Sequence, residues 1–232
     1  MIPKRDTTCQ TKFEGDRLLG GVIATRAHRF KLLGGHPALD FVNTVRDWTV
    51  DKPYDYLCEF SDAIRFGETA GLLTRTDALH LRSRSPKVEL RQLKQLRALL
   101  RRVFQTWLTR KPPRRSDLQK LSWDFGESAR SMRFTVGTHT PGSRLVPIRR
   151  EVAPEKAGDA LLRFRIVDAA VGLLVSHDTL QLKACPACGW FFLDVSKNRS
   201  RRWCSMRTCG SVAKARRYYR RKKAAAVLRS NR

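Results

Sequence analysis

Apolar residues recur at intervals of three and four positions in two long segments of the chain, which is the spacing of one face of an α-helix. The first segment, residues 90–107, predicts a helix that begins at Ser85-Pro86 and ends at the Lys-Pro-Pro sequence of residues 111–113. The second predicts a helix over residues 155–176 that is opened by Pro154. Shorter helices are predicted at residues 38–45, 57–71, 76–84 and 116–131, with Pro37 at the first helical position and with Thr76 and Ser116 as N-caps.

Extended segments are few. Residues 133–137 and 144–150 predict a β-hairpin around the turn sequence at residues 140–143. Short strands are predicted at residues 29–33 and 190–193. Because residues 1–27 have weak periodicity, we expect them to be loosely structured. The large N-terminal part of the chain is therefore predicted to be mostly helical with a little sheet.

Basic residues dominate the charge and gather at the C-terminus. The 232 residues include 47 Lys and Arg against 21 Asp and Glu, a formal net charge of +26. Residues 197–232 contain 14 Lys and Arg and no acidic residue, which favours an acidic polymer as partner, either nucleic acid or an anionic membrane surface. The longest apolar run, residues 169–175, is far shorter than the roughly 20 residues of a membrane span, and the first residues predict no secretory signal.

Four of the six cysteines form two closely spaced pairs. Cys185 and Cys188 are separated by two residues, Cys204 and Cys209 by four, and 15 residues lie between the pairs. Both separations let two thiolates bind one tetrahedral zinc ion, and the gap lets a hairpin bring the pairs together. Four sulfur ligands leave no open position for water, so the predicted Zn²⁺ is structural. The alternative is four unrelated thiols or two disulfides.

Three common enzyme motifs are absent from the sequence. It has no Gly-rich phosphate loop, no G-x-S-x-G elbow and no H-E-x-x-H, and its five histidines show no ligand spacing. A zinc deaminase would need H-x-E followed by P-C-x-x-C, but Ala184 precedes Cys185 and residues 177–179 read His-Asp-Thr. We predict that the chain is not an enzyme. A deep cleft around Asp40 and Asn43 would favour the alternative of an enzymatic N-terminal domain.

A basic helix is predicted directly after the last cysteine. Ser211 can cap it, and seven of the ten residues from Lys214 to Lys223 are Lys or Arg. Phosphates would relieve their mutual repulsion and release counterions. The alternatives are a solvated, frayed tail and a membrane-surface helix, although large apolar anchors for a membrane are missing. A narrow face that rests on the zinc module is predicted from Val212, Ala215, Tyr219 and Ala226.

The predicted partner of this surface is nucleic acid, with duplex DNA as the main hypothesis, structured RNA or the ribosome as the alternative, and no membrane. Phosphates would be contacted by the basic helix and by the loop between the cysteine pairs. The candidate contact residues are Arg199, Arg201, Arg202, Lys214, Arg216, Arg217, Arg220 and Arg221.

Several motifs resemble those of a known family. The C-terminal part of the chain resembles the CGNR zinc finger. The segments that carry this resemblance are Cys185-Pro-Ala-Cys188, residues 192–196, residues 202–205 and Cys209-Gly210. Residues 34–44 look like the start of the ABATE domain that normally precedes this finger. The Cys-Gly-Asn-Arg motif that names the finger reads Cys-Gly-Ser-Val at residues 209–212. Any contact made by its Arg is therefore missing here unless Arg216 or Arg217 substitutes.

The resemblance implies a bacterial, stress-induced transcription regulator that binds DNA through its finger, in the cytoplasm and associated with the nucleoid. The expected fold class is α+β. Residues 1–27 are loosely structured, residues 28–179 form an ABATE-like α+β domain with a small β-hairpin, and residues 180–232 form a CGNR-like four-cysteine zinc finger that ends in a basic helix.

The N-terminal domain is expected to sense an unknown small-molecule effector or to form a homodimer. Asp40 and Asn43 could line a ligand pocket in such a sensory domain. The alternative for both residues is a capping or buried hydrogen-bond role near the Gly34–Thr44 junction, because Asp and Asn commonly satisfy local backbone groups.

Overall fold

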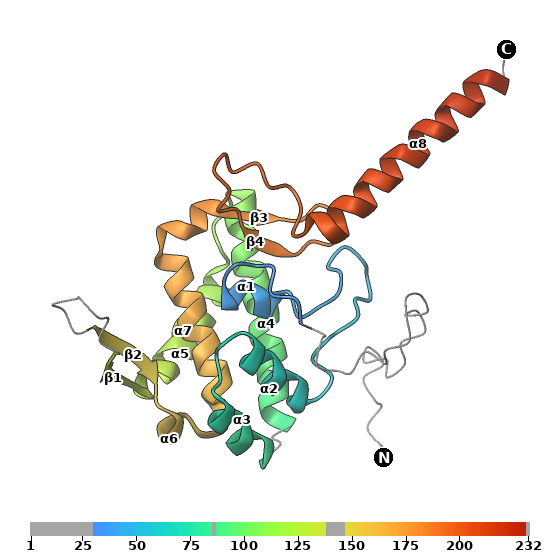
Figure 1. The fold of residues 1–232 in the computed structure, drawn as a ribbon. Helices are drawn as coiled ribbons and strands as arrows, with labels where there is room; N and C mark the ends of the chain where they lie inside the picture. The colour runs from blue at the N-terminus through green and yellow to red at the C-terminus, as the bar shows by residue number, and fades with distance from the viewer. Residues whose placement is uncertain (1–29, 85–86, 138–146, 231–232) are drawn as a thin grey trace, which may run out of the picture.

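The computed structural model describes residues 30–84, 87–137 and 147–230 (Figure 1). The predicted loose segment, residues 1–27, and the predicted hairpin turn, residues 140–143, lie outside the described residues. In chain order the elements are α1 (Pro37–Val42), α2 (Phe60–Thr69), α3 (Arg75–Arg82), α4 (Lys87–Thr109), α5 (Arg115–Arg130), β1 (Met132–Val136), β2 (Ile148–Val152), α6 (Pro154–Ala157), η2 (Gly158–Ala160), α7 (Leu161–Val175), η3 (His177–Gln181), β3 (Leu182–Ala184), β4 (Phe191–Leu193), η4 (Met206–Gly210) and α8 (Ser211–Ser230).

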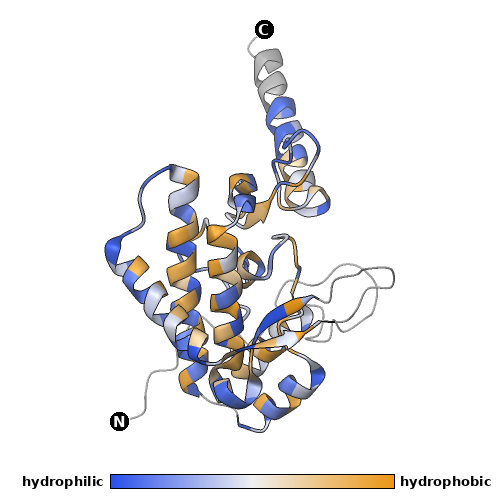
Figure 2. Ribbon diagram, turned by 90° about the vertical axis from the view of Figure 1, so that its left-hand side faces the viewer, coloured by the Kyte–Doolittle hydropathy of each residue, from blue (hydrophilic) through white to orange (hydrophobic). Residues whose placement is uncertain are grey.

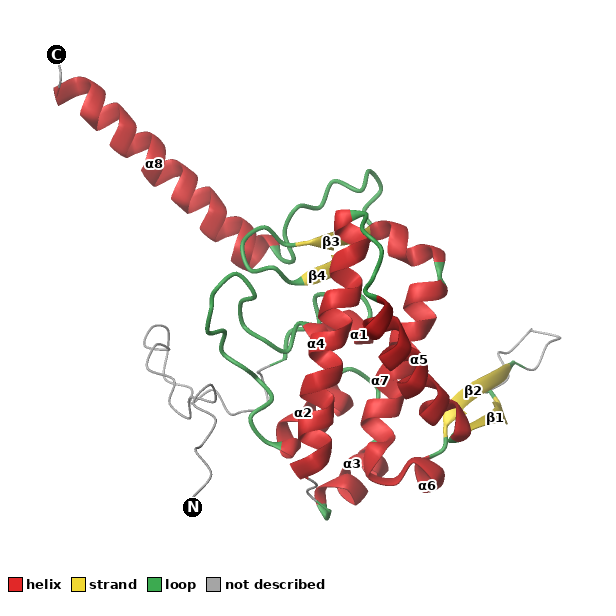
Figure 3. Cartoon of the chain, turned by 180° about the vertical axis from the view of Figure 1, so that it is seen from behind, coloured by secondary structure: helices red, strands yellow, loops and turns green. Residues whose placement is uncertain are grey.

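Two long helices, α4 and α7, form the centre of the N-terminal domain (Figures 1 and 3). Apolar residues lie on most sides of α7, which packs against α1, α4 and α5. A helix that is apolar nearly all round must be covered by other elements. Figure 2 shows the apolar positions of the long helices in the interior of the molecule.

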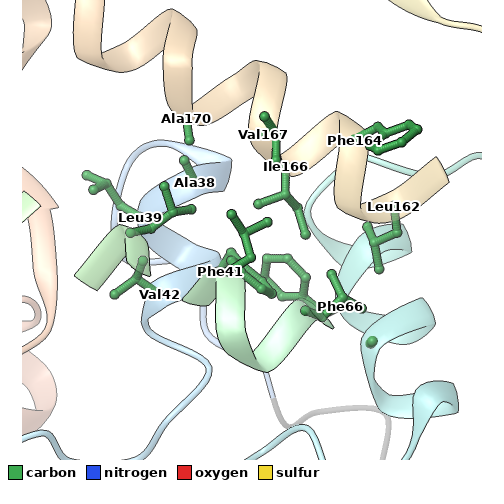
Figure 4. Packing of buried hydrophobic residues seen from close by; sticks show 14 of the residues in the cluster. Ala38, Leu39, Phe41, Val42, Phe66, Leu162, Phe164, Ile166, Val167 and Ala170 are labelled. Carbon is green, nitrogen blue, oxygen red and sulfur yellow. The ribbon is translucent and has the colours of Figure 1, made fainter. Parts of the chain in front are cut away.

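The main core forms where α1, α2 and α7 meet (Figure 4). Phe41 of α1 and Phe66 of α2 are fully buried, with ring centroids 5.7 Å apart. Ile166 of α7 is also completely buried beside them. This contact anchors the short helix α1, whose following residues reach toward the C-terminal module.

The helix over residues 90–107 is confirmed as α4, although its predicted start at Ser85-Pro86 lies outside the described residues. Its apolar face is buried apart from Leu90, which is half-buried, and Trp107, which is 41% exposed. The predicted helix over residues 155–176 is interrupted. α6 ends at Ala157, because the φ of 52° at Gly158 is incompatible with an α-helix, and α7 begins at Leu161. The strand predicted at residues 29–33 is absent from its described part, residues 30–33. Thr74 and Arg114 hold the N-cap positions that were predicted for Thr76 and Ser116.

Two antiparallel two-stranded sheets complete the fold. The predicted hairpin is confirmed as β1–β2, with Met132 opposite Val152 and Val136 opposite Ile148. The second sheet pairs β3 with β4. β3 ends just before the first cysteine pair, and β4 begins shortly after it.

The structure confirms the predicted class, a mostly helical α+β domain followed by a four-cysteine module and a basic helix. Among the described residues, no helix combines the length and apolar character needed to cross a bilayer.

Candidate metal centre

The four clustered cysteines converge at one point. Their sulfur atoms all lie within 4.8 Å of one another. The Cys188–Cys204, Cys204–Cys209 and Cys209–Cys188 sulfur distances are 3.7, 3.6 and 3.7 Å. Four sulfurs bound tetrahedrally at 2.3 Å from a zinc ion would be about 3.8 Å apart. The donor set and its spacing therefore fit a metal ion of zinc's size and softness.

The first cysteine pair lies in a tight turn between β3 and β4. Gly189 N–H donates to the Cys185 carbonyl at 2.8 Å, and Cys185 N–H donates to the Trp190 carbonyl at 2.8 Å. Gly189 has φ of 70°, which favours glycine because no Cβ is present to clash. We call residues 185–189 the knuckle. Its turn points both sulfurs toward the second pair.

The thiols lie in a buried, mutually coupled group. Cys185, Cys188 and Cys204 are buried and Cys209 is half-buried. Hydrogen bonds with Cys188 and Cys204 lower the pKa of Cys185. Cys204 has a raised pKa of about 12, because it is hydrogen-bonded to Cys185 and buried. Four thiolates at this separation repel one another, so a cation is needed for all four to ionise together.

Asp194 organises the loop between the two cysteine pairs. Its fully buried carboxylate accepts hydrogen bonds from Lys183 Nζ at 2.5 Å, from Ser196 Oγ at 2.6 Å and from Arg201 N–H at 2.9 Å. Burial alone would raise the pKa of Asp194, but the bonds from Lys183 and Ser196 outweigh it and hold the pKa below its usual range. Sequence reasoning did not assign this role, although an isolated acid before a wholly basic segment was a usable signal.

Arg201 supports the fold of this loop. Its guanidinium donates to the carbonyls of Trp203 at 3.0 Å, Leu33 at 3.2 Å and Cys204, and stacks 4.4 Å from the Phe192 ring centroid. These contacts engage the guanidinium that sequence analysis assigned to phosphate. Arg201 is half-buried, and its phosphate contact stays a prediction.

Arg199 and Arg202, the other candidates on this loop, lie at the surface. Arg199 is exposed and has φ of 47°, while Arg202 is exposed and stacks 5.1 Å from the Trp203 ring centroid. Both side chains can therefore reach an external partner.

The basic helix α8 follows the last cysteine without a break. Cys209 lies inside the turn η4, and Ser211 has helical φ and ψ of −63° and −44°. The Ser211 hydroxyl donates to the Met206 carbonyl at 2.9 Å, so Ser211 does not cap α8 as predicted. A cap is unnecessary because η4 itself precedes the helix.

Most of α8 projects away from the rest of the chain (Figures 1 and 3). Three residues of the predicted contact face do not rest on the zinc module, since Val212 is 48% exposed, Tyr219 is 68% exposed and Ala215 is exposed. The side chain of the fourth, Ala226, lies outside the described part of the structure. The basic side chains described on α8 are also exposed: Lys214, Arg216, Arg217, Arg220, Arg221 and Lys222.

Asp40 and Asn43 are both buried. Asp40 Oδ1 accepts from Gly34 N–H at 2.7 Å. Asn43 donates to the Phe191 carbonyl at 2.8 Å and accepts from the Phe191 N–H at 2.9 Å. These are the contacts of the hydrogen-bond alternative. A separate hollow of about 420 Å³ lies between α4, α5 and α7, with Gln92, Arg102, Trp123 and Phe164 among its lining residues.

Two family models match the chain. The ABATE model, described as a putative stress-induced transcription regulator, matches residues 35–177. The CGNR zinc finger model matches residues 181–222. A comparison with curated proteins finds no match.

Proposed function

The chain belongs to the ABATE family, and on that premise we propose that it is a bacterial, zinc-dependent DNA-binding regulator of transcription. In this proposal residues 28–179 are the regulatory unit and residues 180–232 the DNA-binding unit. The protein acts in the cytoplasm, on the nucleoid, and its role is regulatory, not enzymatic. An effector and a homodimer remain predictions for the N-terminal unit.

Zinc is the metal proposed for Cys185, Cys188, Cys204 and Cys209. The sulfur separations of 3.6 to 3.7 Å agree with a tetrahedral site, and thiolate ligands are preferred by Zn²⁺. When bound, zinc would act as a structural cross-link that neutralises the thiolates. The chain itself places the second pair of cysteines just before the first residue of α8. A metal ion bound there would fix the direction of the helix axis relative to the rest of the protein.

The exposed charge pattern of α8 is the observation that carries the proposal. At about 100° per residue, its basic side chains from Lys214 to Lys222 spread over roughly 240° of the helix circumference. A helix charged on this much of its surface suits a groove with phosphates on both walls. The B-DNA major groove, about 12 Å wide, admits a helix, whereas the A-form RNA major groove is too narrow.

We therefore favour duplex DNA over RNA. Lys214, Arg216, Arg217, Arg220 and Arg221 would contact phosphates or base edges in the groove. Arg199 and Arg202 would contact the adjacent backbone, and Arg201 stays a predicted contact whose guanidinium also supports the loop. RNA or ribosome binding stays the second candidate, supported by the same basic surface.

The test compares duplex DNA, hairpin RNA and heparin as competitors for the full-length protein. We expect duplex DNA to compete best, with log affinity falling linearly with log salt concentration. The triple substitution R216Q/R217Q/R220Q should flatten that slope by about 3, roughly 0.9 per lost phosphate contact.

The charge-matched control is R75Q/R91Q/K156Q, which removes three exposed cations of the N-terminal unit and should leave the slope unchanged. Equal competition by heparin and duplex DNA would reduce the proposal to non-specific charge. An affinity independent of salt would contradict it.

A further inference from the structure

The knuckle is in direct contact with the ABATE domain. Trp48 N–H donates to the Cys188 carbonyl at 2.9 Å, and Arg101 Nη1 donates to the Gly189 carbonyl at 2.6 Å. One acceptor belongs to a cysteine of the metal centre and the other to the glycine that closes its turn. The ABATE domain therefore contacts the backbone that sets the direction of both sulfurs.

Arg101 is well placed to hold this turn. It comes from the buried side of α4, and its guanidinium lies 4.0 Å from the Phe191 ring centroid and 5.2 Å from that of Trp48. Rings on two sides restrict the rotamers of this side chain, and a charged donor makes a stronger hydrogen bond than a neutral one. Arg101 thus forms a rigid connection between α4 and the knuckle.

The contact extends along β4 on the far side of the knuckle. The Asn43 carboxamide pairs with both the N–H and the carbonyl of Phe191 at 2.9 and 2.8 Å. Leu193 N–H donates to the Gly34 carbonyl at 2.8 Å, and Trp190 Nε1–H donates to the Val45 carbonyl at 2.7 Å. β4 is therefore fixed to residues before and after α1.

Packing leaves no space between the two surfaces at the turn. A Cβ atom added to Gly189 would lie 2.9 Å from Trp48 Cβ and 3.3 Å from Arg101 Nη2. Phe191 and Leu193 belong to the main core of the ABATE domain, while Phe192 packs with the cysteines. The alternating residues of one strand thus join the two cores.

We propose that Asn43, Trp48 and Arg101 of the ABATE domain are positioning residues of the metal centre, which hold the knuckle in the shape that binds the ion. Metal retention is then a property of the two units together, although each unit matches its own family model. The inference rests on the proposed zinc site. By linkage, bound metal stabilises the docked arrangement of residues 43–48 and α4 to the same extent.

The first test is the substitution R101M, which keeps side-chain length and removes the donor to Gly189. Groups that orient metal ligands from outside typically contribute 10- to 100-fold in metal affinity. We expect full-length R101M to bind Zn²⁺ about 10- to 100-fold more weakly than wild type in competition with a chromophoric chelator. A dissociation constant within twofold of wild type would overturn the inference.

The matched control is R102M, the next residue of α4. Arg102 pairs with Asp117, which is on α5, and makes no contact with the knuckle in the described structure. It controls for the loss of one Arg side chain, with its charge and its hydrogen bonds, from the same helix. Its Zn²⁺ affinity should stay within twofold of wild type.

A second measurement needs no variant and decides the case if R101M does not fold. Hydrogen exchange of the wild-type chain is compared before and after zinc is removed with a chelator. We expect faster exchange at residues 43–48 and in the C-terminal half of α4 as well as in residues 182–210. Faster exchange confined to residues 182–210 would contradict the inference.

These outcomes separate the inference from the proposed function. Absence of zinc binding by the wild type would refute both the proposed metal site and the inference. Normal zinc and DNA binding by R101M would refute the inference alone.

Discussion

At the scale of single residues, Asp194 shows how one carboxylate can order a loop whose remaining charges are all positive. Its carboxylate accepts hydrogen bonds from Lys183 of β3 and from Ser196 and the Arg201 N–H of the loop. Arg201, which reads as a phosphate contact in sequence, is half-buried: its backbone N–H donates to this acid, and its guanidinium donates to the carbonyls of Leu33 and Trp203.

We predict that Asp194→Asn lowers the Tm by several degrees at neutral pH. The neutral carboxamide has only one acceptor oxygen and no negative charge, so it cannot replace the carboxylate as acceptor of all these hydrogen bonds. The pKa of Asp194 is depressed in the folded state, so its contribution is present above the unfolded pKa near 4 and is lost as pH falls through the folded value. Thermal unfolding measured by circular dichroism checks this. An unchanged Tm at pH 7 would contradict it.

Asp40 should have the opposite pH dependence. Burial raises its pKa to about 6, despite the hydrogen bonds from Gly34 and Leu33, so its favourable contribution is complete below about pH 4 and is lost as pH rises through 6. Relative to wild type, Asp40→Asn should gain about 1 kcal/mol of unfolding free energy between pH 5 and pH 8.

Denaturant unfolding at several pH values measures this difference. Asp51→Asn, a substitution on an exposed loop, is the control and should track wild type across the range. Parallel curves for wild type and Asp40→Asn would show that Asp40 does not titrate in this range.

At the scale of elements, regular spacing was a good predictor and local conformations were not. α4 was predictable because its apolar residues keep helical spacing through to Phe104 and a Lys-Pro-Pro sequence follows. The interruption at Gly158 depends on a positive φ that glycine permits without requiring. Similarly, Ser211 reads as an N-cap, but the turn η4 already supplies the start of α8.

The helix α8 is the element with the least support from packing. It has 20 residues, and its described side chains are largely exposed. Like charges at adjacent turns repel, and most helical stability in proteins comes from packing of an apolar face, which the described side chains of α8 do not provide. We predict that duplex DNA increases the helical circular dichroism signal by up to the 20 residues of α8, and more at low salt than at high salt. An unchanged signal at saturating DNA would contradict this expectation.

At the scale of the whole molecule, the candidate metal centre divides into a part that sequence could predict and a part that it could not. The ligands were predictable because the two cysteines of each pair lie only three or five positions apart. Arg101 and Asn43 were not, because they lie 88 and 148 residues from Gly189 and Phe191. Such contacts depend on how the domains pack, which periodicity does not encode.

The turn η4 also fixes a quantity that composition does not reveal, the rotational phase of α8. Cys209 lies within η4, and α8 follows at the next residue but one. Each residue advances a helix by about 100° and 1.5 Å. One residue inserted between Gly210 and Lys214 would therefore swing every arginine of the helix about 100° around its axis with the basic run itself unaltered. The number of residues between Cys209 and Lys214 therefore determines which way the basic side chains of α8 face relative to the metal centre.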